Sequence, residues 1–457
     1  MTLEPQSPVF SATRIAEILA VPPAVPLTPT AEQRTVIEHP LGGSALVVAG
    51  AGSGKTETMA NRVVWLVANG LVSPDQVLGL TFTRKAAGEL RERISLRLAL
   101  FVSRLQDQAE REQLSEIEAA HAARLTELLA DGLELPEVST YNAFAAGVLQ
   151  EFGIAAGVAP GAVIIDEATA WRIARETALQ STDSALVQSE LRLPQIVNHV
   201  LNLDHAVADN LTSFDRVDQI VSEFARVLEL PYSEKELTGE RSGKVYAPVR
   251  DAVAALKETP LITRLAREFA EEKQRRGVLE FSDQLALATR AIERSRDAIS
   301  ILRQRHRVIL LDEVQDTSVG QTRFLSRIFA GRSVMAVGDP HQSIYGWRGA
   351  SAEGLQSFHA DFRGRGETAT PPATLTLSTS WRNPGRVLDV ANVIAAPSRT
   401  RRPWLCQSSH PGRARSRAAS NGYSPRPCMK NDTPWQPGCV MPGKRTSRAT
   451  ANCRVQP

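Results

Sequence analysis

Cysteine is missing from the first 405 of the 457 residues, and the four that follow have spacings unlike those of zinc sites: Cys406, Cys428, Cys439 and Cys453. Long apolar runs are missing too, because no stretch approaches the ~20 residues of a membrane span. The N-terminal MTLEPQSPVF lacks the basic and then apolar order of a signal peptide. These absences exclude a disulfide-stapled secreted protein and a membrane protein, and they predict a cytoplasmic chain with no membrane partner.

A surplus of basic residues is absent from most of the chain. Residues 397–457 hold ten Arg and two Lys but a single acid, Asp432, so residues 1–396 contain 41 basic and 49 acidic side chains. The formal net charge of +3 therefore does not indicate a basic protein surface. Any nucleic-acid binding must come from a local groove.

The C-terminal stretch lacks the apolar residues that a core requires. After Ala396 it contains one Leu, two Val and neither Ile nor Phe, so it cannot bury enough apolar surface to offset its ordering entropy. A basic nucleic-acid-binding arm would have this charge, but the abrupt change in composition and the presence of Trp404 and Trp435 favour a frameshift or readthrough. We expect residues 395–457 to form a basic tail of low order.

Four short, continuous apolar runs lie at 45–48, 77–82, 308–311 and 334–337. Each is followed by a turn or helix signal, which is typical of parallel strands covered on both faces. Helical periodicity dominates between them, over 88–130 and 167–276. The pattern predicts an α/β core with a large, mainly helical insertion.

A glycine-rich loop follows the first of these runs. It consists of Ala49, Gly50, Ala51, Gly52, Ser53, Gly54, Lys55 and Thr56. Such a loop turns its backbone N–H groups toward phosphate oxygens, and the N-terminus of the next helix adds its positive dipole end. Lys55 would then reach the β- and γ-phosphates of ATP, and the Thr56 hydroxyl would bind Mg²⁺.

Two Asp-Glu pairs compete for the second carboxylate site that a phosphate-binding loop needs. Asp166-Glu167 opens a helical stretch, where both acids suit helix capping. Asp312-Glu313 follows an apolar run and precedes another one that ends in Gly338-Asp339, with Gln342 just beyond. We assign Mg²⁺ binding to Asp312, proton abstraction from water to Glu313, and γ-phosphate sensing to Gln342.

Seven ordered motifs resemble those of the UvrD/Rep-like superfamily 1 DNA helicases. They are Leu27–Gln33, Thr81–Ala87, Ser139–Phe144, Glu280–Leu285, Asp312–Asp316, Gly338–Ala350 and Ser378–Asn383. The resemblance implies a RecA-like P-loop parallel sheet with a large helical insertion, followed by a second RecA-like domain that is truncated. The expected parts are an N-terminal extension (1–26), motor domain 1A (27–100 and 277–377), a helical domain 1B (101–276), the start of motor domain 2A (378–394) and the tail (395–457).

The resemblance also implies roles for particular residues. Gln33 would read the adenine of ATP, and Arg382 would be an arginine finger on the γ-phosphate. Single-stranded DNA exposes base faces on which aromatic side chains stack. The expected nucleic-acid contacts are Phe82, Thr140, Asn142, Tyr345, Trp347 and Arg348.

The implied activity is ATP hydrolysis coupled to 3′ to 5′ movement on single-stranded DNA or a duplex with a single-stranded tail, with a second helicase subunit as a further partner. Asn142 and Trp381 replace a common His and Tyr, and their motifs resemble those of actinobacterial RecBCD-like helicase-nucleases. Because too few residues follow 394 for a second motor domain, we expect little or no unwinding. The alternatives are a non-catalytic ATP- and DNA-binding or partner-binding fragment, and an RNA helicase of the same superfamily.

Overall fold

The structure is a computed structural model of the whole chain. It describes residues 8–20, 27–128, 135–230, 246–346, 354–364, 371–401 and 410–411. Most of the predicted low-order tail (395–457) therefore lies outside the described residues, as do Trp347 and Arg348, but residues 395–401 continue a helix and 410–411 form a short strand.

Ten strands alternate with helices along the described chain. The strands are β1 (Ser44–Ala49), β2 (Val77–Thr81), β3 (Glu137–Thr140), β4 (Val163–Ile164), β5 (Val278–Leu279), β6 (Val308–Leu311), β7 (Ser333–Gly338), β8 (Ala373–Leu377), β9 (Thr379–Ser380) and β10 (His410–Pro411). Helices near the N-terminus are α1 (Ala12–Leu19), α2 (Ala31–Ile37), α3 (Lys55–Ala68), α4 (Arg84–Glu110), α5 (Glu116–Leu128) and α6 (Tyr141–Phe152). The middle of the chain forms α7 (Glu167–Gln180), α8 (Ala185–Gln188), α9 (Leu193–Asp209), α10 (Phe214–Ala225), α12 (Ala247–Ala254) and α13 (Thr259–Arg276). The remaining helices are α14 (Phe281–Arg294), α15 (Ala298–Arg305), α16 (Val319–Phe329), α17 (Gly354–Asp361) and α18 (Gly385–Arg401).

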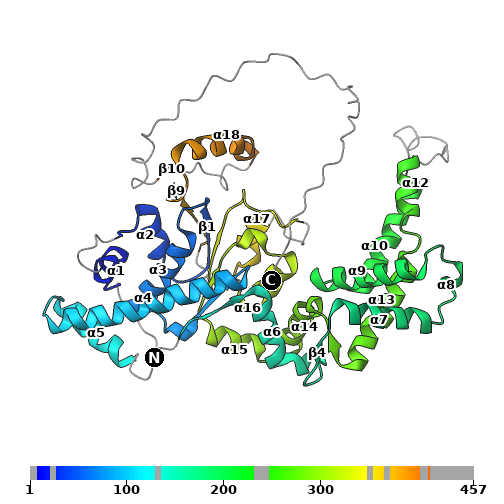
Figure 1. The fold of residues 1–457 in the computed structure, drawn as a ribbon, viewed down its shortest axis with the longest axis horizontal. Coiled ribbons are helices and arrows are strands. Elements are labelled where there is room, and N and C mark those ends of the chain that lie inside the picture. Colours follow the sequence, from blue (N-terminus) through cyan, green and yellow to red (C-terminus); the bar gives the residue numbers. More distant parts are fainter. Residues whose placement is uncertain are drawn as a thin grey trace, which may run out of the picture. The chain divides into compact units, whose positions relative to one another are not determined.

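A six-stranded parallel sheet forms the centre of the fold, in the order β3-β2-β6-β7-β1-β8 (Figure 1). The four apolar runs of the sequence are β1, β2, β6 and β7, so the predicted α/β class is confirmed. Successive strand residues point to opposite faces, and Leu46 and Val47 of β1 are both fully buried on different sides. Two-sided burial is why these strands appear as continuous apolar runs.

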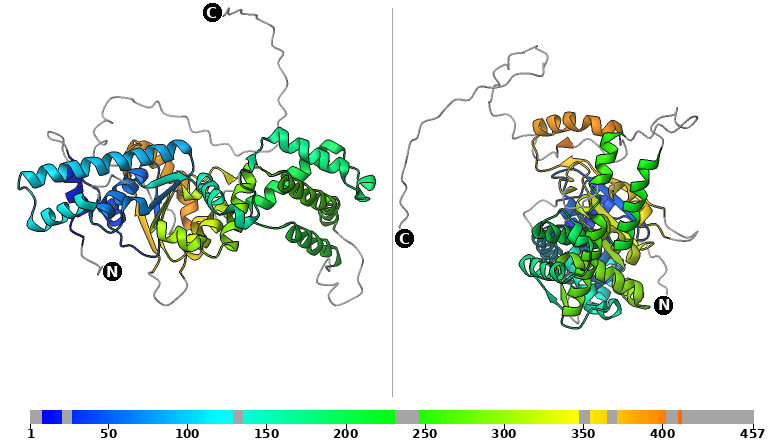
Figure 2. Two further views of the ribbon diagram at one scale, coloured as in Figure 1. Left: turned by 90° about the horizontal axis from the view of Figure 1, so that it is seen from below. Right: turned by 90° about the vertical axis from the view of Figure 1, so that its right-hand side faces the viewer.

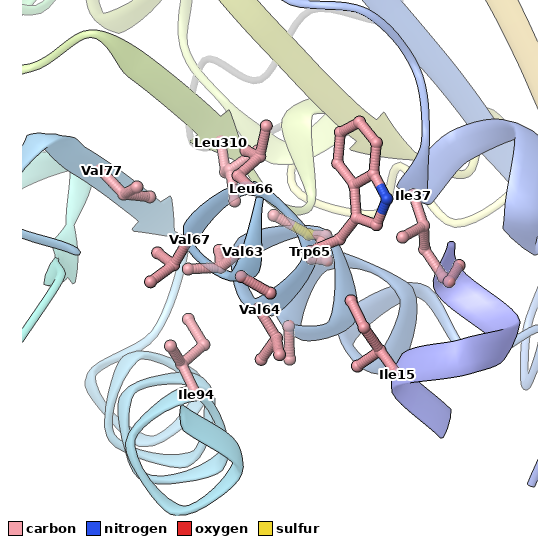
Figure 3. Packing of buried hydrophobic residues seen from close by; sticks show 14 of the residues in the cluster. Ile15, Ile37, Val63, Val64, Trp65, Leu66, Val67, Val77, Ile94 and Leu310 are labelled. Carbon is pink, nitrogen blue, oxygen red and sulfur yellow. The ribbon is translucent and has the colours of Figure 1, made fainter. Parts of the chain in front are cut away.

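Helices cover both faces of the sheet (Figures 1 and 2). Helices α1 to α5 pack on one face, and α6 and α14 to α17 on the other. The side chains of α3 lie between Ile15 of α1, Ile37 of α2 and Ile94 of α4 (Figure 3). Although α1 falls within the predicted N-terminal extension, its residues Ile15 and Ile18 are buried in this core.

The helical insertion has a hydrophobic core of its own. Helices α7, α9 and α13 enclose it, around Val197, Leu265 and Phe269. By contrast, β3 and α6 pack with the main sheet, although they fall within the predicted insertion at 101–276. Helix α4 also runs without a break across the predicted boundary at residue 100. The sequence does not reveal these features, because three of the four residues of β3 are polar and because no residue pattern marks where a long helix leaves the sheet.

No helix in the described ranges combines the length and the apolar character needed to cross a membrane.

Candidate nucleotide and nucleic-acid site

Strand order explains how distant motifs meet. The carboxyl ends of parallel strands lie on one edge of a sheet, and loops beyond that edge form the usual ligand site of such folds. The glycine-rich loop follows β1, Asp312 follows β6, and Asp339 follows β7, which lies between β1 and β6. Phe82 follows β2, and Thr140 ends β3. The nucleotide motifs and the predicted nucleic-acid contacts therefore occupy adjoining parts of the same edge.

The glycine-rich loop has the backbone of a phosphate cradle. Gly52 and Gly54 have φ values of +75° and +83°, which lie in the left-handed backbone region that residues with a side chain rarely adopt. Helix α3 begins directly after them at Lys55, so its first amide groups and its positive dipole end face the loop. Ala49 ends β1 and is fully buried. Strand β1, the loop at 50–54 and helix α3 thus form the strand, loop and helix arrangement that the sequence predicted.

Lys55 and Glu313 contact each other across the site. The Lys55 Nζ lies 3.0 Å from Glu313 Oε2, and the lysine side chain is only 11% exposed. Asp312 is buried, and burial, reinforced by the charge of Glu313, raises its pKa to about 6. The pKa of Asp316 is raised for the same reasons. One lysine therefore faces a group of three carboxylates, which leaves a surplus of negative charge suited to a divalent cation.

Gln315, for which the sequence indicated no role, links the acidic turn after β6 to the turn after β7 that contains Asp339. Gln315 is buried, and its Nε2 donates to Glu313 Oε2 at 2.7 Å. Its Oε1 accepts from the backbone N–H of Asp339 at 3.0 Å. Gln342 donates to the carboxylate of Asp339 in turn. A chain of hydrogen bonds, one of them from the backbone N–H of Asp339, therefore connects Glu313 with the loop that carries Gln342.

The other acidic pair, Asp166-Glu167, lies at the start of a helix, where its position predicted a capping role. Asp166 is the N-cap of α7, and its carboxylate accepts from the backbone N–H of Thr169 at 2.9 Å. Hydrogen bonding by the Thr169 side chain, and then by its backbone N–H, lowers the pKa of Asp166. This pair lies in the helical insertion, outside the edge that carries Lys55 and Asp312.

Gln33 lies beside the glycine-rich loop. A Cβ built on Gly54 would be 3.2 Å from Gln33 Nε2. The Gln33 Oε1 accepts from the backbone N–H of Thr30, which closes a capping box at the start of α2. With its oxygen engaged by the cap, Gln33 presents Nε2 on the loop side.

Arg62 holds the other end of α2. This residue of α3 is 1% exposed, and its Nη1 donates to the carbonyls of Val36, Ile37 and His39 at 3.1, 3.0 and 2.7 Å. Burial lowers the pKa of Arg62 to about 9, so the side chain stays charged at neutral pH. It thereby joins the helix after the glycine-rich loop to the helix that carries Gln33.

Replacing Arg62 by Met is therefore expected to lower the free energy of unfolding by about 1–3 kcal/mol, the cost of orphaned buried carbonyls. Thermal unfolding measures the loss. Arg104→Met on α4, which removes a partly exposed pair with Asp107, should have a much smaller effect. Equal melting temperatures for the two variants would contradict the capping role.

The segment around Arg382 packs directly on the glycine-rich loop. The backbone N–H of Trp381 donates to the Gly52 carbonyl at 2.8 Å, and Ser380 Oγ donates to the Ala51 carbonyl at 3.0 Å. A Cβ on Gly52 would lie 2.6 Å from the Cβ of Arg382. Gly52 is therefore required both for its backbone angle and for this close approach.

The predicted nucleic-acid contacts divide into two groups. Phe82 and Tyr345 are half-buried and stack on each other, with ring centroids 4.9 Å apart and an interplanar angle of 27°. Thr140 caps α6 through its hydroxyl, and the exposed Asn142 accepts from Gln321 Nε2 at 2.8 Å. The structure brings these four residues to the same edge of the sheet. Their contact with nucleic acid stays a prediction.

Comparison with known proteins agrees with this arrangement. Residues 29–363 match the family described as the UvrD/REP helicase N-terminal domain. The ATP-dependent DNA helicase PcrA of Leuconostoc citreum is 28% identical over 364 residues, which are 79% of this chain and 38% of that protein. DNA helicase II of Haemophilus influenzae is 26% identical over 369 residues, which are 80% of this chain and 40% of that protein.

The chain spans about two fifths of the length of these curated relatives. The resemblance to the RecBCD-like branch stays a prediction. The family match nevertheless covers five of the six strands of the sheet, the helical insertion and most of the predicted motifs. The chain belongs to the UvrD/Rep helicase family.

Proposed function

We propose that this chain binds and hydrolyses ATP as the motor part of a cytoplasmic DNA helicase or translocase, moving 3′ to 5′ on single-stranded DNA or on a duplex with a single-stranded tail. The observation that carries the proposal is the contact between Lys55 of the glycine-rich loop and Glu313 of the acidic turn. A lysine aimed at phosphates and a carboxylate able to activate water are the two groups that phosphoryl transfer to water needs side by side.

The donor set suits Mg²⁺ bound together with a nucleotide. No cage of three acidic, His or Cys side chains occurs among the described residues. Mg²⁺ in such sites takes one or two protein oxygens and completes its shell with phosphates and waters, and it assists by neutralising charge on the phosphates. Thr56 and Asp312 would supply those protein oxygens.

The remaining residues have separate roles in this proposal. Glu313 takes the proton of the attacking water, and Gln342 reports the γ-phosphate to the loop that carries Tyr345. Arg382 stabilises charge on the transferring phosphoryl group, and Gln33 donates from Nε2 to the adenine. Because the chain spans about two fifths of its relatives, we expect the isolated 457-residue polypeptide to unwind duplex DNA weakly or not at all.

Steady-state ATP hydrolysis with and without single-stranded DNA tests the proposal. We expect DNA to stimulate hydrolysis, and Lys55→Ala to remove the signal, which would exclude a contaminating ATPase. An RNA strand of the same sequence should stimulate less. Nucleotide and DNA binding without hydrolysis would favour the alternative, a non-catalytic binding fragment. Unwinding assays with and without a candidate second helicase subunit would test that partner.

Replacing Tyr345 by Ala is expected to weaken binding of an oligo(dT) strand about tenfold, because loss of one base-stacking aromatic costs ~1–3 kcal/mol. Fluorescence anisotropy measures the dissociation constant. The exposed Tyr246, which lies in the helical insertion next to α12, offers a matched control, and Tyr246→Ala should bind normally. Unchanged affinity in Tyr345→Ala would assign the Phe82–Tyr345 stack to packing.

A further inference from the structure

The turn between β3 and α6 is tied to the acidic turn after β6 by a buried hydrogen bond. The hydroxyl of Tyr141 donates to the backbone carbonyl of Asp312 at 2.8 Å, across 171 positions of sequence. Tyr141 is 3% exposed. It stands between Thr140 and Asn142, two of the predicted nucleic-acid contacts.

The carbonyl that Tyr141 holds belongs to the peptide group joining Asp312 to Glu313. The N–H of the same peptide group donates to Asp312 Oδ1 at 3.0 Å, so the group is held at both ends. Beyond it, Glu313 has a left-handed backbone, with φ +50° and ψ +45°. A residue with a side chain keeps such a conformation only when its surroundings enforce it, and these conformations gather at functional sites.

A second bond, on the surface, joins the β3–α6 turn to the start of helix α16. Gln321 Nε2 donates to Asn142 Oδ1, and Gln321 is also the third residue of α16, where its Oε1 closes the capping box with Ser318. Helix α16 begins shortly after the acidic turn that contains Asp312 and Glu313. Residues 140–142 are therefore bonded both to the acidic turn and to the helix that follows it.

We propose that Tyr141 is a positioning residue that couples nucleic acid bound at Thr140 and Asn142 to the placement of Asp312 and Glu313. The inference rests on the proposed function, because it assigns a link between the two ligand sites of that function. A strand that shifts the β3–α6 turn pulls on the Asp312 carbonyl through the Tyr141 hydroxyl. It thereby changes how the metal-binding carboxylate and the base face the nucleotide.

The coupling is measured as a ratio of two dissociation constants. Binding of a labelled oligo(dT) to the full chain is titrated with and without saturating Mg²⁺ and the non-hydrolysable β,γ-imido analogue of ATP. The wild-type ratio should differ from one, and Tyr141→Phe, which removes only the hydroxyl, should move it toward one by about fivefold. That change corresponds to about 1 kcal/mol at 1.4 kcal/mol per tenfold, the typical net value of one hydrogen bond.

Two further variants separate coupling from stability. Gln321→Glu keeps an acceptor for the capping box but removes the donor to Asn142, so it should shift the ratio in the same direction. Thr177→Val removes another buried hydroxyl, which donates to the Ile173 carbonyl within the helical insertion, and it should leave the ratio unchanged. Melting temperatures of all variants show whether each one folds.

A wild-type ratio of one, or an unchanged ratio in folded Tyr141→Phe, overturns the inference while leaving the proposed function intact. If Tyr141→Phe does not fold, Gln321→Glu decides, and its unchanged ratio overturns the inference. Failure of the wild type to bind either ligand in the separate titrations overturns the proposed function as well. The two failures are therefore distinguishable.

Discussion

Replacing Glu313 by Gln is expected to lower the rate of DNA-stimulated ATP hydrolysis by about 10²- to 10⁴-fold, the usual contribution of a general base. The amide cannot take a proton from water, yet its oxygen still accepts the bond from Gln315 Nε2. The loop geometry is therefore preserved. Removing the charge also frees Lys55 from its ion pair, so nucleotide affinity should be kept or increased.

The informative result is a loss of ATP hydrolysis without a loss of nucleotide binding. Hydrolysis is measured as the rate at saturating ATP and single-stranded DNA, and binding as the dissociation constant of a fluorescent ATP analogue. Glu151→Gln provides the control, because Glu151 pairs with Arg305 at the surface and lies outside the site. Full activity in Glu313→Gln would rule out the base assignment. Loss of nucleotide binding would instead make Glu313 a structural partner of Lys55.

The strands that the sequence revealed are those buried on both faces. β1, β2, β6 and β7 are central in the sheet, and each is a continuous apolar run. The strands that escaped notice lie at the two edges of the sheet, where β3 reads EVST and β8 reads ATLTL. An edge strand has one neighbour and partial exposure, so polar residues interrupt its pattern.

Residue types in the site could be predicted, but the bonds between them could not. The glycines, Lys55 and the Asp312-Glu313 pair follow from what phosphate and metal binding require locally. Gln315 and Tyr141 act through partners on other strands, so no spacing in the sequence indicates them. Tyr141 in particular resembles an ordinary core aromatic until the carbonyl of Asp312 is placed beside its hydroxyl.

The helical insertion joins the motor around a second lysine. Lys273 of α13 is nearly fully buried, and its Nζ lies 2.5 Å from Asp204 of α9, 2.9 Å from Glu280 and 2.9 Å from Asp283 of α14. Burial alone lowers the pKa of Lys273, but the three carboxylates outweigh that effect and raise it. Burial raises the pKa of Asp204 to about 6 despite the lysine. Among the described residues, Lys273 brings the only ammonium group to this cluster, and the imidazole of His205, whose Nε2 lies 2.8 Å from Glu280 Oε1, adds a positive charge only when it is protonated.

Replacing Lys273 by Met is expected to lower the free energy of unfolding by about 3–5 kcal/mol, because it leaves buried carboxylates without their cation. Thermal or urea unfolding of the full chain measures the loss. The same substitution at Lys257, whose pair with Glu190 is exposed on both sides, should cost less than about 1 kcal/mol. A difference of less than twofold between the two losses would contradict a central role for Lys273.

The stability of the wild type and that of Lys273→Met should depend on pH in different ways. Because the pKa of Lys273 is raised in the folded chain, this residue contributes fully to the free energy of unfolding of the wild type below the ordinary lysine pKa. The contribution is lost only in strongly alkaline solution. The pKa of Asp204 is already raised by burial, and Lys273 acts to lower it, so in Lys273→Met it should rise further above that of the unfolded chain and the variant should lose stability as pH rises through it. The gap in melting temperature should therefore be widest near neutral pH and narrow toward pH 5 as the acids take up protons. A gap that widened on acidification would show that the carboxylates, rather than the lysine, hold the insertion in place.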